Sequence, residues 1–509
     1  PARYYVTSDD RVILASEVGV LDLPPEIILH KGRLEPGRML WIDTEEGRLI
    51  SDEEIKSQLI TARPYRQWLK DYMVDLEDLP DPPVPPLGGI GRDLEGRNRE
   101  EKVLQYQQAF GYTYEDLNLL LAPMARTGVE PLGSMGNDAP LAVLSDRPQL
   151  LYNYFKQLFA QVTNPPIDAI REELITSTVV IIGSEQNLLE PKAENCRQIK
   201  LRHPILNNEE LEKLRSLNRL YFRSETLPIL YNPAEGGAGL EKAMQNLFDQ
   251  ADEIIANGEA NILILSDRGV DKDHAPIPAL LALSGLHHYL IRKGTRTLVG
   301  FVLETGEPRE VHHFATLIGY GVMAINPYLA YDSIADMIDQ GILTDVDYEH
   351  AWKNYTKAIM KGVVKVISKM GISTVQSYCA SQIFEAVGLN QDFVNKYFTW
   401  TPSRIGGVGI DVIAEETHTR HKQAFPDRVV NGQTLDVGGV YQWRRNGEHH
   451  LFNPQSVYKL QNACRTNSYT TFKEYSHLIN DQSEKMGTLR GLFEFKFASN
   501  PIPVDEVES

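Results

Sequence analysis

Cysteine is scarce in this sequence, with three residues among 509, at positions 196, 379 and 464. They are odd in number and far apart, and none forms a C-x-x-C pair. This excludes a disulfide framework or a cysteine-rich zinc site as the organising principle of the fold. Such low cysteine usage is typical of a reducing compartment.

Basic charge is also in deficit. Lys and Arg number 51 against 69 Asp and Glu, which gives a net charge of −18. Phosphate affinity comes from clustered basic residues, so the sequence argues against a nucleic-acid binder that works by bulk charge. An acidic surface also repels anionic membranes.

Long apolar runs are missing as well. The longest uncharged stretch, 311–331, contains paired histidines, glycines, Asn326 and Pro327. It predicts a buried helix and turn and no membrane span.

The remaining composition is that of a globular protein, and the length predicts roughly three domains of ~150 residues. Short strands and a hairpin at 39–50 give residues 1–55 a β-rich character. Five prolines among residues 80–86 then predict a linker over 78–91, because such a run cannot enter a helix or a central strand.

Strands and helices alternate in the middle of the chain, which predicts an α/β fold with a parallel sheet, open or closed into a barrel. In either architecture, sites gather at the carboxyl ends of the strands. The expected strands are 262–265, 297–303 and 373–378, and the expected helices are 279–293, 311–324, 348–369 and 382–387.

Several motifs offer chemistry, each with an ordinary structural alternative. The histidine pairs 287–288, 312–313 and 449–450 invite a metal hypothesis, but adjacent residues on a helix point ~100° apart, so satisfied histidines are the default. The glycines at 236–239 suggest an anion-binding loop before a helix, or simply a helix entry. The segment 403–407 suggests a phosphate loop or a tight crossing between domains.

Two polar loops, 133–138 and 161–168, carry small hydroxyl and amide side chains that could line a channel for a small polar molecule. Turn chemistry explains the same residues, because Asn, Asp and Ser bond their own backbone. No nucleophile–base pair is visible. The residues alone therefore indicate a large acidic α/β protein with a β-rich start.

Long words of sequence at these loops resemble the central domain of the glutamate synthase large (alpha) subunit. They lie at 130–138, 158–173, 265–268, 312–321, 324–329 and 369–374. The stretches 15–21 and 34–39 resemble the last strands of that family's class II glutaminase domain, and 398–407 resembles the bridge into its FMN-binding synthase domain. Trp400 and Ala380-Ser381 depart from the family, which is expected to have glycine there.

The resemblance implies a domain division. Residues 1–70 would end a class II glutamine amidotransferase (α+β sandwich) domain, and 71–395 would be a central βα domain related to a (β/α) barrel. Residues 396–509 would begin an FMN-binding (β/α)8 barrel. The glutaminase cysteine would lie before Pro1 and the flavin and cluster residues after Ser509, so no catalytic, cofactor or metal residue is expected in this chain.

The resemblance also implies the chemistry of the complete enzyme. Glutamine is hydrolysed, ammonia crosses an internal tunnel, and reduced FMN converts the imine formed with 2-oxoglutarate into L-glutamate. Electrons would arrive through an iron–sulfur cluster from ferredoxin or from an NAD(P)H-oxidising small subunit. The expected compartment is the cytoplasm, or the plastid stroma in a photosynthetic eukaryote.

A closed path keeps ammonia neutral and out of bulk water. Its lining is expected to be uncharged and hydrogen-bonding, which selects Ser134, Asn137, Thr163 and Asn164 as channel or domain-contact residues. Two alternatives remain. One is a stand-alone α/β enzyme with a site at the strand-end loop 266–269, and the other is a non-catalytic assembly module.

Overall fold

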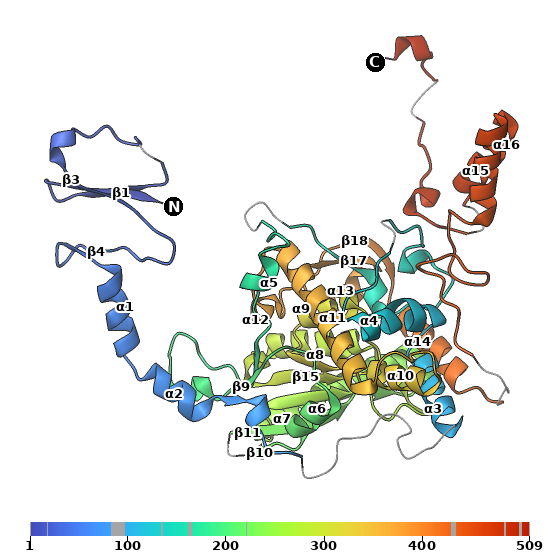
Figure 1. Cartoon of the computed structure of the whole chain (residues 1–509), viewed down its shortest axis with the longest axis horizontal. Coiled ribbons are helices and arrows are strands. Elements are labelled where there is room, and N and C mark those ends of the chain that lie inside the picture. The colour runs from blue at the N-terminus through green and yellow to red at the C-terminus, as the bar shows by residue number, and fades with distance from the viewer. Residues whose placement is uncertain are drawn as a thin grey trace. The chain divides into compact units, whose positions relative to one another are not determined.

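The structure is a computed structural model that describes residues 2–17, 19–82, 97–133, 136–160, 165–219, 221–428, 434–482, 485–497 and 501–507. The chain divides into two compact units (Figure 1). The first comprises Pro1–Met73 and Pro191–Cys196, and the second comprises Val74–Glu190 and Arg197–Ser509. Most of the predicted proline-rich linker lies outside the described residues.

The first unit is built from short antiparallel strands. Its three-stranded sheet has the order β2-β1-β3, with β1 (Arg3–Thr7), β2 (Val12–Ala15) and β3 (Ile28–Arg33). A hairpin of β4 (Trp41–Asp43) and β5 (Arg48–Ile50) precedes α1 (Asp52–Thr61) and α2 (Tyr65–Tyr72). The β-rich start and the hairpin predicted from the sequence are confirmed.

A mostly parallel sheet forms the centre of the second unit. Its order is β10-β11-β13-β15-β16, with β10 (Asn218–Arg219), β11 (Phe222–Pro228), β13 (Ile262–Ser266), β15 (Gly300–Glu304) and β16 (Ala324–Asn326). The last four strands run parallel. Every residue of β13 and β15 is buried, as is usual for parallel strands covered on both faces. The α/β class is confirmed, and kinship to a barrel stays a prediction.

Helices connect these strands in the expected alternation (Figure 1). They are α7 (Gly236–Asn257), α8 (Ala279–Lys293), α9 (Val311–Gly319), α10 (Tyr328–Asp339) and α11 (Tyr348–Lys369). The bounds of α8 and α11 are those that the sequence predicts. Gly294, at φ +74°, ends α8 in the left-handed conformation that glycine tolerates.

Further helices and small sheets complete the second unit. The helices are α3 (Arg97–Ala109), α4 (Ala122–Thr127), α5 (Glu172–Ile175), α6 (Asn208–Arg215), α12 (Val375–Tyr378), α13 (Gln391–Tyr397), α14 (Ile410–Ala424), α15 (Pro454–Thr466) and α16 (Tyr469–Asn480). Strands β6 (Val74–Asp75), β8 (Val180–Ile182) and β9 (Ile199–Leu201) form one sheet, and β12 (Leu230–Tyr231) pairs with β14 (Ala275–Pro276). Within the described residues, no helix combines the length and apolar character that crossing a bilayer requires.

The predictions for two short segments after α11 are wrong, because the expected strand contains a helix and the expected helix is a strand. The expected strand 373–378 contains α12, because the Thr374 hydroxyl accepts the N–H of Ser377 and caps a helical turn. The expected helix 382–387 is strand β17 (Phe384–Leu389), which pairs with β7 (Phe155–Gln157) and β18 (Ser403–Val408). A short apolar run has no periodicity that distinguishes a helix from a strand, so its secondary structure depends on the distant segments that pair with it.

The glycine segments also require corrections. Residues 403–407 belong to β18 and form no phosphate loop. A Cβ on Gly407 would lie 2.2 Å from the carbonyl oxygen of Gly388, so glycine allows β18 to approach β17 closely, and a crossing between domains stays a prediction. Glycines 236–239 form the first turn of α7, where a Cβ on Gly237 would meet Oδ1 of Asp411 at 2.0 Å. The helix predicted over 311–324 ends at Gly319, and Gly321 at φ +106° starts the turn into β16.

The two departures from the expected glycine pattern coincide with left-handed backbone. Ala380 has φ +59° and Trp400 has φ +69°, a region that side chains with a Cβ adopt at a cost. The Trp400 side chain is 91% exposed, so little packing offsets this strain.

We expect Trp400→Gly to raise the free energy of unfolding by about 0.5–1 kcal/mol, because glycine tolerates positive φ. Urea denaturation measures the change through the midpoint at constant slope. Trp443→Gly is the matched control, since Trp443 is also exposed and does not have positive φ. A gain in both variants, or in neither, would contradict the assignment to backbone strain.

Candidate functional site

The carboxyl ends of the parallel strands are closed by the protein's own side chains. Glu304, at the end of β15, is 1% exposed and accepts hydrogen bonds from Ser266 Oγ (2.6 Å), Arg268 Nε (2.6 Å) and Arg215 Nη2 (2.7 Å). Burial opposes ionisation, but the two guanidinium groups outweigh it and hold the pKa of Glu304 below its ordinary value. This internal network argues against loop 266–269 as a ligand site.

Asp267 lies in the same closed edge and is fully buried. Its carboxylate accepts hydrogen bonds from the Thr305 hydroxyl, the Tyr328 hydroxyl (2.8 Å) and the N–H of Gly306 (3.1 Å). Burial outweighs these three donors and raises the pKa of Asp267 to about 8. The group therefore titrates as a structural acid within the core.

Two neighbouring cavities lie where residues 434–452, which we call the strap, cross the domain. The smaller has a volume of about 590 Å³ and the larger about 1210 Å³. Glu310, Val440 and Tyr441 line both, so the strap and the start of α9 form the boundary between them.

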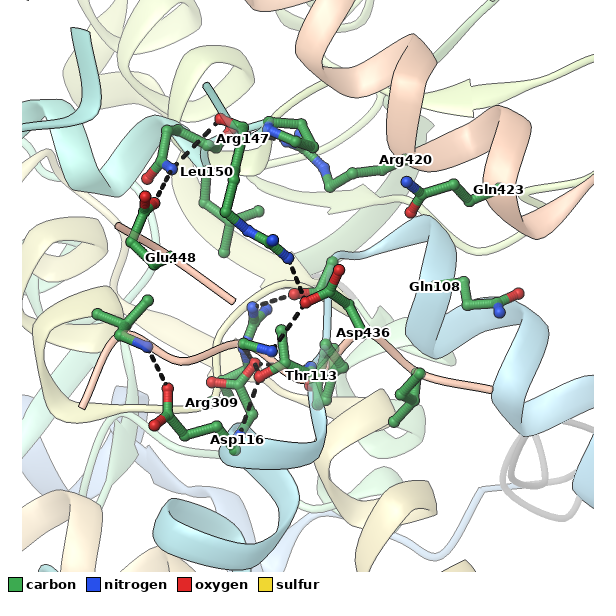
Figure 2. Close-up of a pocket in the computed structure, with 18 of the residues that line it drawn as sticks. Gln108, Thr113, Asp116, Arg147, Leu150, Arg309, Arg420, Gln423, Asp436 and Glu448 are labelled. Carbon is green, nitrogen blue, oxygen red and sulfur yellow. Dashed lines mark hydrogen bonds and ion pairs between the residues drawn. The ribbon is translucent and has the colours of Figure 1, made fainter. Parts of the chain in front are cut away.

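Arg147, Arg309 and Arg420 line the smaller cavity together with several carboxylates (Figure 2). Arg309 is 4% exposed and donates to the carbonyl oxygens of Phe110 (3.1 Å) and Gly111 (2.6 Å). Its Nε lies 3.2 Å from Oδ2 of Asp116, and Arg147 pairs with Asp436 of the strap. These guanidinium groups therefore hold the cavity walls together.

The larger cavity is lined by residues before and within α4, by 129–133 and 136–138, by the start of α9 and by 440–442. Asn137 is exposed at its edge, and its Oδ1 accepts the N–H of Ala139 at 2.9 Å. Asn137 thus lies beside a cavity and makes a turn contact at the same time. Ser134, Thr163 and Asn164 lie outside the described residues, so all four channel assignments stay predictions.

A single carboxylate fastens the tip of the strap. Glu115 accepts the backbone N–H groups of Val440 (2.6 Å), Tyr441 (3.1 Å) and Gln442 (2.9 Å). The Tyr441 hydroxyl then donates to Oε2 of Glu310 at 2.6 Å, on the boundary between the cavities. The strap is therefore bonded to the turn before α4 and to the start of α9.

In two of the histidine pairs, one imidazole is bonded to groups of the protein itself, as the structural alternative predicts. His287 Nδ1 accepts Arg296 Nε at 2.9 Å, and His312 Nε2 lies 3.0 Å from the carbonyl oxygen of Tyr152. Burial lowers the pKa of both imidazoles. Across the described part of the chain, no three His, Cys, Asp or Glu side chains gather as a metal site would require.

Sequence reasoning did not identify the residues that form the boundary, which are Glu115, Glu310 and Tyr441. They lie up to 326 positions apart and belong to no motif. Glu310 follows the end of strand β15 by six residues. The rule that sites gather after parallel strands is the one sequence signal that could have indicated Glu310 as a site residue.

The comparisons with known proteins agree with this architecture. Residues 105–390, more than half of the chain, match the family model of the glutamate synthase central domain. The chain belongs to that family. Residues 1–68 also match the model of class-II glutamine amidotransferases.

Curated relatives align over the whole chain. They include the glutamate synthase [NADPH] large chain of Bacillus subtilis (51% identity, 32% of its length), glutamate synthase [NADH] of Schizosaccharomyces pombe (40%, 24%) and ferredoxin-dependent glutamate synthase 2 of Synechocystis (39%, 33%). The chain thus spans about a third or less of these glutamate synthases. Solved structures of flavocytochrome b2 mutants give TM-scores of 0.20 and 0.22 at 11% identity, too low to support an argument.

The raised pKa of Asp267 predicts that stability falls as the pH rises. Between about 4, where the unfolded carboxyl titrates, and about 8, the folded chain binds one more proton at Asp267 than the unfolded chain. Asp267 therefore lowers the free energy of unfolding by up to about 1.4 kcal/mol per pH unit in this window.

Urea denaturation at pH 5, 6, 7 and 8 measures this slope, and Asp267→Asn should remove the Asp267 share of it. Asp339→Asn is the control, since Asp339 is half-exposed in an ion pair with Arg99. Equal slopes in the wild type and Asp267→Asn would show that the carboxyl is ionised throughout.

Proposed function

We propose that this chain is the connecting part of a glutamate synthase, the enzyme that forms L-glutamate from L-glutamine and 2-oxoglutarate. The observation that carries the proposal is the order of family matches along one chain. A class-II amidotransferase match at 1–68 is followed by the central-domain match at 105–390. The names of the relatives, glutamate synthases that use NADPH, NADH or ferredoxin, support it.

The domain division follows from the same proposal. Residues 1–70 end the amidotransferase domain, residues 71–395 form a central domain related to a (β/α) barrel, and residues 396–509 lead into the FMN-binding synthase domain. The separate first compact unit, Pro1–Met73 with Pro191–Cys196, supports the first boundary.

The role of this part is to hold two active sites in register and to wall the route of ammonia between them. The larger cavity is the feature that suits this role. It is bordered by Asn137, and two of its acidic wall residues have local hydrogen-bonding partners. Glu310 accepts from the Tyr441 hydroxyl and lies 3.2 Å from His313 Nε2, and Asp138 lies 2.7 Å from His450 Nδ1. Polar groups that are bonded within the wall suit the passage of a small uncharged molecule.

FMN and an iron–sulfur cluster would supply the redox chemistry of the complete enzyme. The described residues of this chain do not fit either group. Cys379 directs its thiol to the carbonyl oxygen of Val322 at 3.4 Å, and Cys464 is exposed on α15, whereas a cluster needs several thiolates together. The strand ends, where a flavin would bind, are filled by Asp267, Glu304 and Tyr328.

The substrates glutamine and 2-oxoglutarate, and the electron donor, ferredoxin or an NAD(P)H-oxidising subunit, are therefore assigned to other parts of the complete protein. The compartment proposed is the cytoplasm or, in a photosynthetic eukaryote, the plastid stroma.

The first test compares this chain with the longer protein expressed from its complete gene. We expect the isolated chain neither to hydrolyse glutamine nor to bind FMN, and the longer protein to do both. Ammonia release from glutamine and the flavin absorbance of the purified protein measure the two properties. Stoichiometric flavin on the isolated chain would overturn the proposal.

The second test addresses the ammonia route in the longer protein. Asn137→Leu with Thr163→Val should lower glutamine-dependent glutamate formation several-fold and leave ammonia-dependent formation nearly unchanged, because only the former uses the route. Asn187→Leu, on an exposed loop away from the cavity, is the control. Equal losses in both activities would show that these residues do not line a channel.

A further inference from the structure

His450 is a buried histidine that contacts both Asp138 and Gly439. It is 5% exposed, and both ring nitrogens lie at hydrogen-bond distance from an oxygen. Nδ1 is 2.7 Å from Oδ1 of Asp138, and Nε2 is 2.6 Å from the carbonyl oxygen of Gly439. Asp138 also accepts the N–H of Phe452 at 2.9 Å through Oδ2.

Neither partner of the imidazole can donate a hydrogen. A backbone carbonyl oxygen is always an acceptor, and an ionised carboxylate is an acceptor only. Neutral histidine carries one N–H, so it can satisfy only one of these oxygens. The imidazolium carries two and satisfies both, which makes the cation the form that this geometry requires.

The electrostatic surroundings agree with that form. Burial opposes the charge, but the bonds to Gly439 and Asp138 and the charges of Asp138 and Glu115 outweigh it and hold the pKa of His450 above its ordinary value. For Asp138, burial is likewise outweighed, by the N–H of Phe452 and by His450, so its pKa is lowered.

The other titratable groups close to this pair lie along the strap and beyond it. His449 and Glu448 are its chain neighbours, and Lys485 acts on His449. The acidic neighbours of His450 from other segments are Asp138 and Glu115.

The contacts of His450 add to those of Glu115 and Tyr441 in holding the strap. Asp138 lines the larger cavity, and so do Val440, Tyr441 and Gln442 of the strap. His450 joins Asp138 to Gly439, the residue directly before those strap residues. The two bonds therefore connect a residue that lines the larger cavity to the strap segment that also lines it.

We propose that His450, as an imidazolium, is a positioning residue that joins Asp138 to Gly439 of the strap, and that loss of its proton leaves one of these two oxygens without a donor and loosens the contact. The loosening acts within the structure of this chain and does not depend on catalysis. Its consequence for ammonia retention rests on the proposed function above.

The sign of the pH dependence follows from the two shifts. A raised histidine pKa means that the contact is fully present below about pH 6.5 and is lost as the pH rises through the folded pKa. The lowered pKa of Asp138 means that the contact is also lost in strong acid. The contact is therefore present in the intermediate pH range and is weakened at alkaline pH.

Hydrogen–deuterium exchange of the 509-residue chain tests the tie directly. The amide of Phe452, corrected for intrinsic exchange, should lose protection by about tenfold above the pKa of His450, the effect of one charge-assisted bond. Exchange of the imidazole C2 hydrogen in a His449→Gln background, which isolates His450, gives that pKa. A value at or below 6.5 would overturn the proposal.

Three variants sharpen the result. His450→Gln cannot donate to both oxygens, so its Phe452 amide should have low protection at every pH. His449→Gln should keep the pH profile of the wild type. Asp138→Asn should keep protection at every pH, because its amide N–H can donate to neutral His450. Unchanged protection in His450→Gln, or a wild-type pH profile in Asp138→Asn, would contradict the tie.

The functional consequence is measured in the longer protein as free ammonia released per glutamate formed. This leak should rise over the same alkaline range in the wild type and stay constant in Asp138→Asn. A pH-dependent exchange profile without a matching leak would retain the His450 tie and count against the proposed ammonia route.

Discussion

The burial of Glu304 at the carboxyl end of β15 is the constraint on which the rest of the structure depends. A carboxylate at 1% exposure is tolerable only with excellent partners, and it has Ser266, Arg268 and Arg215. These partners come from β13, the loop after it and α6. The ionic network therefore locks neighbouring strands together and closes the edge where α/β proteins usually bind ligands.

Closing that edge leaves the open volume at another place in the fold. The two cavities lie under the strap, where segments from sequence positions near 115, 138, 310 and 440 meet. Two carboxylates form their boundary, and each has partners nearby. Glu115 accepts three backbone N–H groups, and Glu310 accepts from the Tyr441 hydroxyl and lies beside His313. Such an arrangement is consistent with the role proposed above, which is to shape a passage between sites on other domains.

Asp138 also has a local partner, His450, but this pair differs from Glu115 and Glu310 in one respect. Glu115 accepts three backbone N–H groups, which do not titrate, and Glu310 accepts a hydrogen bond from the Tyr441 hydroxyl. The contacts of His450 with Asp138 and Gly439 together need an N–H on both ring nitrogens, so the proposed pH dependence lies at this part of the strap.

The sequence alone determined the parts of this protein that depend on local rules. Apolar runs such as 262–265 and the long helices 279–293 and 348–369 follow from periodicity and from glycine at a helix end. The long words around 130–138 and 158–173 identified the family, which the comparisons confirm. Glycine expected at 380 and 400 matched left-handed backbone at both positions.

Only the tertiary structure decided the rest. Residues 384–389 are a strand because β7 and β18 lie beside them, although the short apolar run has no periodicity to show it. Glu115, Glu310, Tyr441 and His450 became one site because the chain returns to the same place after 130 residues or more, and no local pattern records such a return. The sequence could not indicate the protonation of His450, because the two acceptor oxygens beside it come together only in the folded chain.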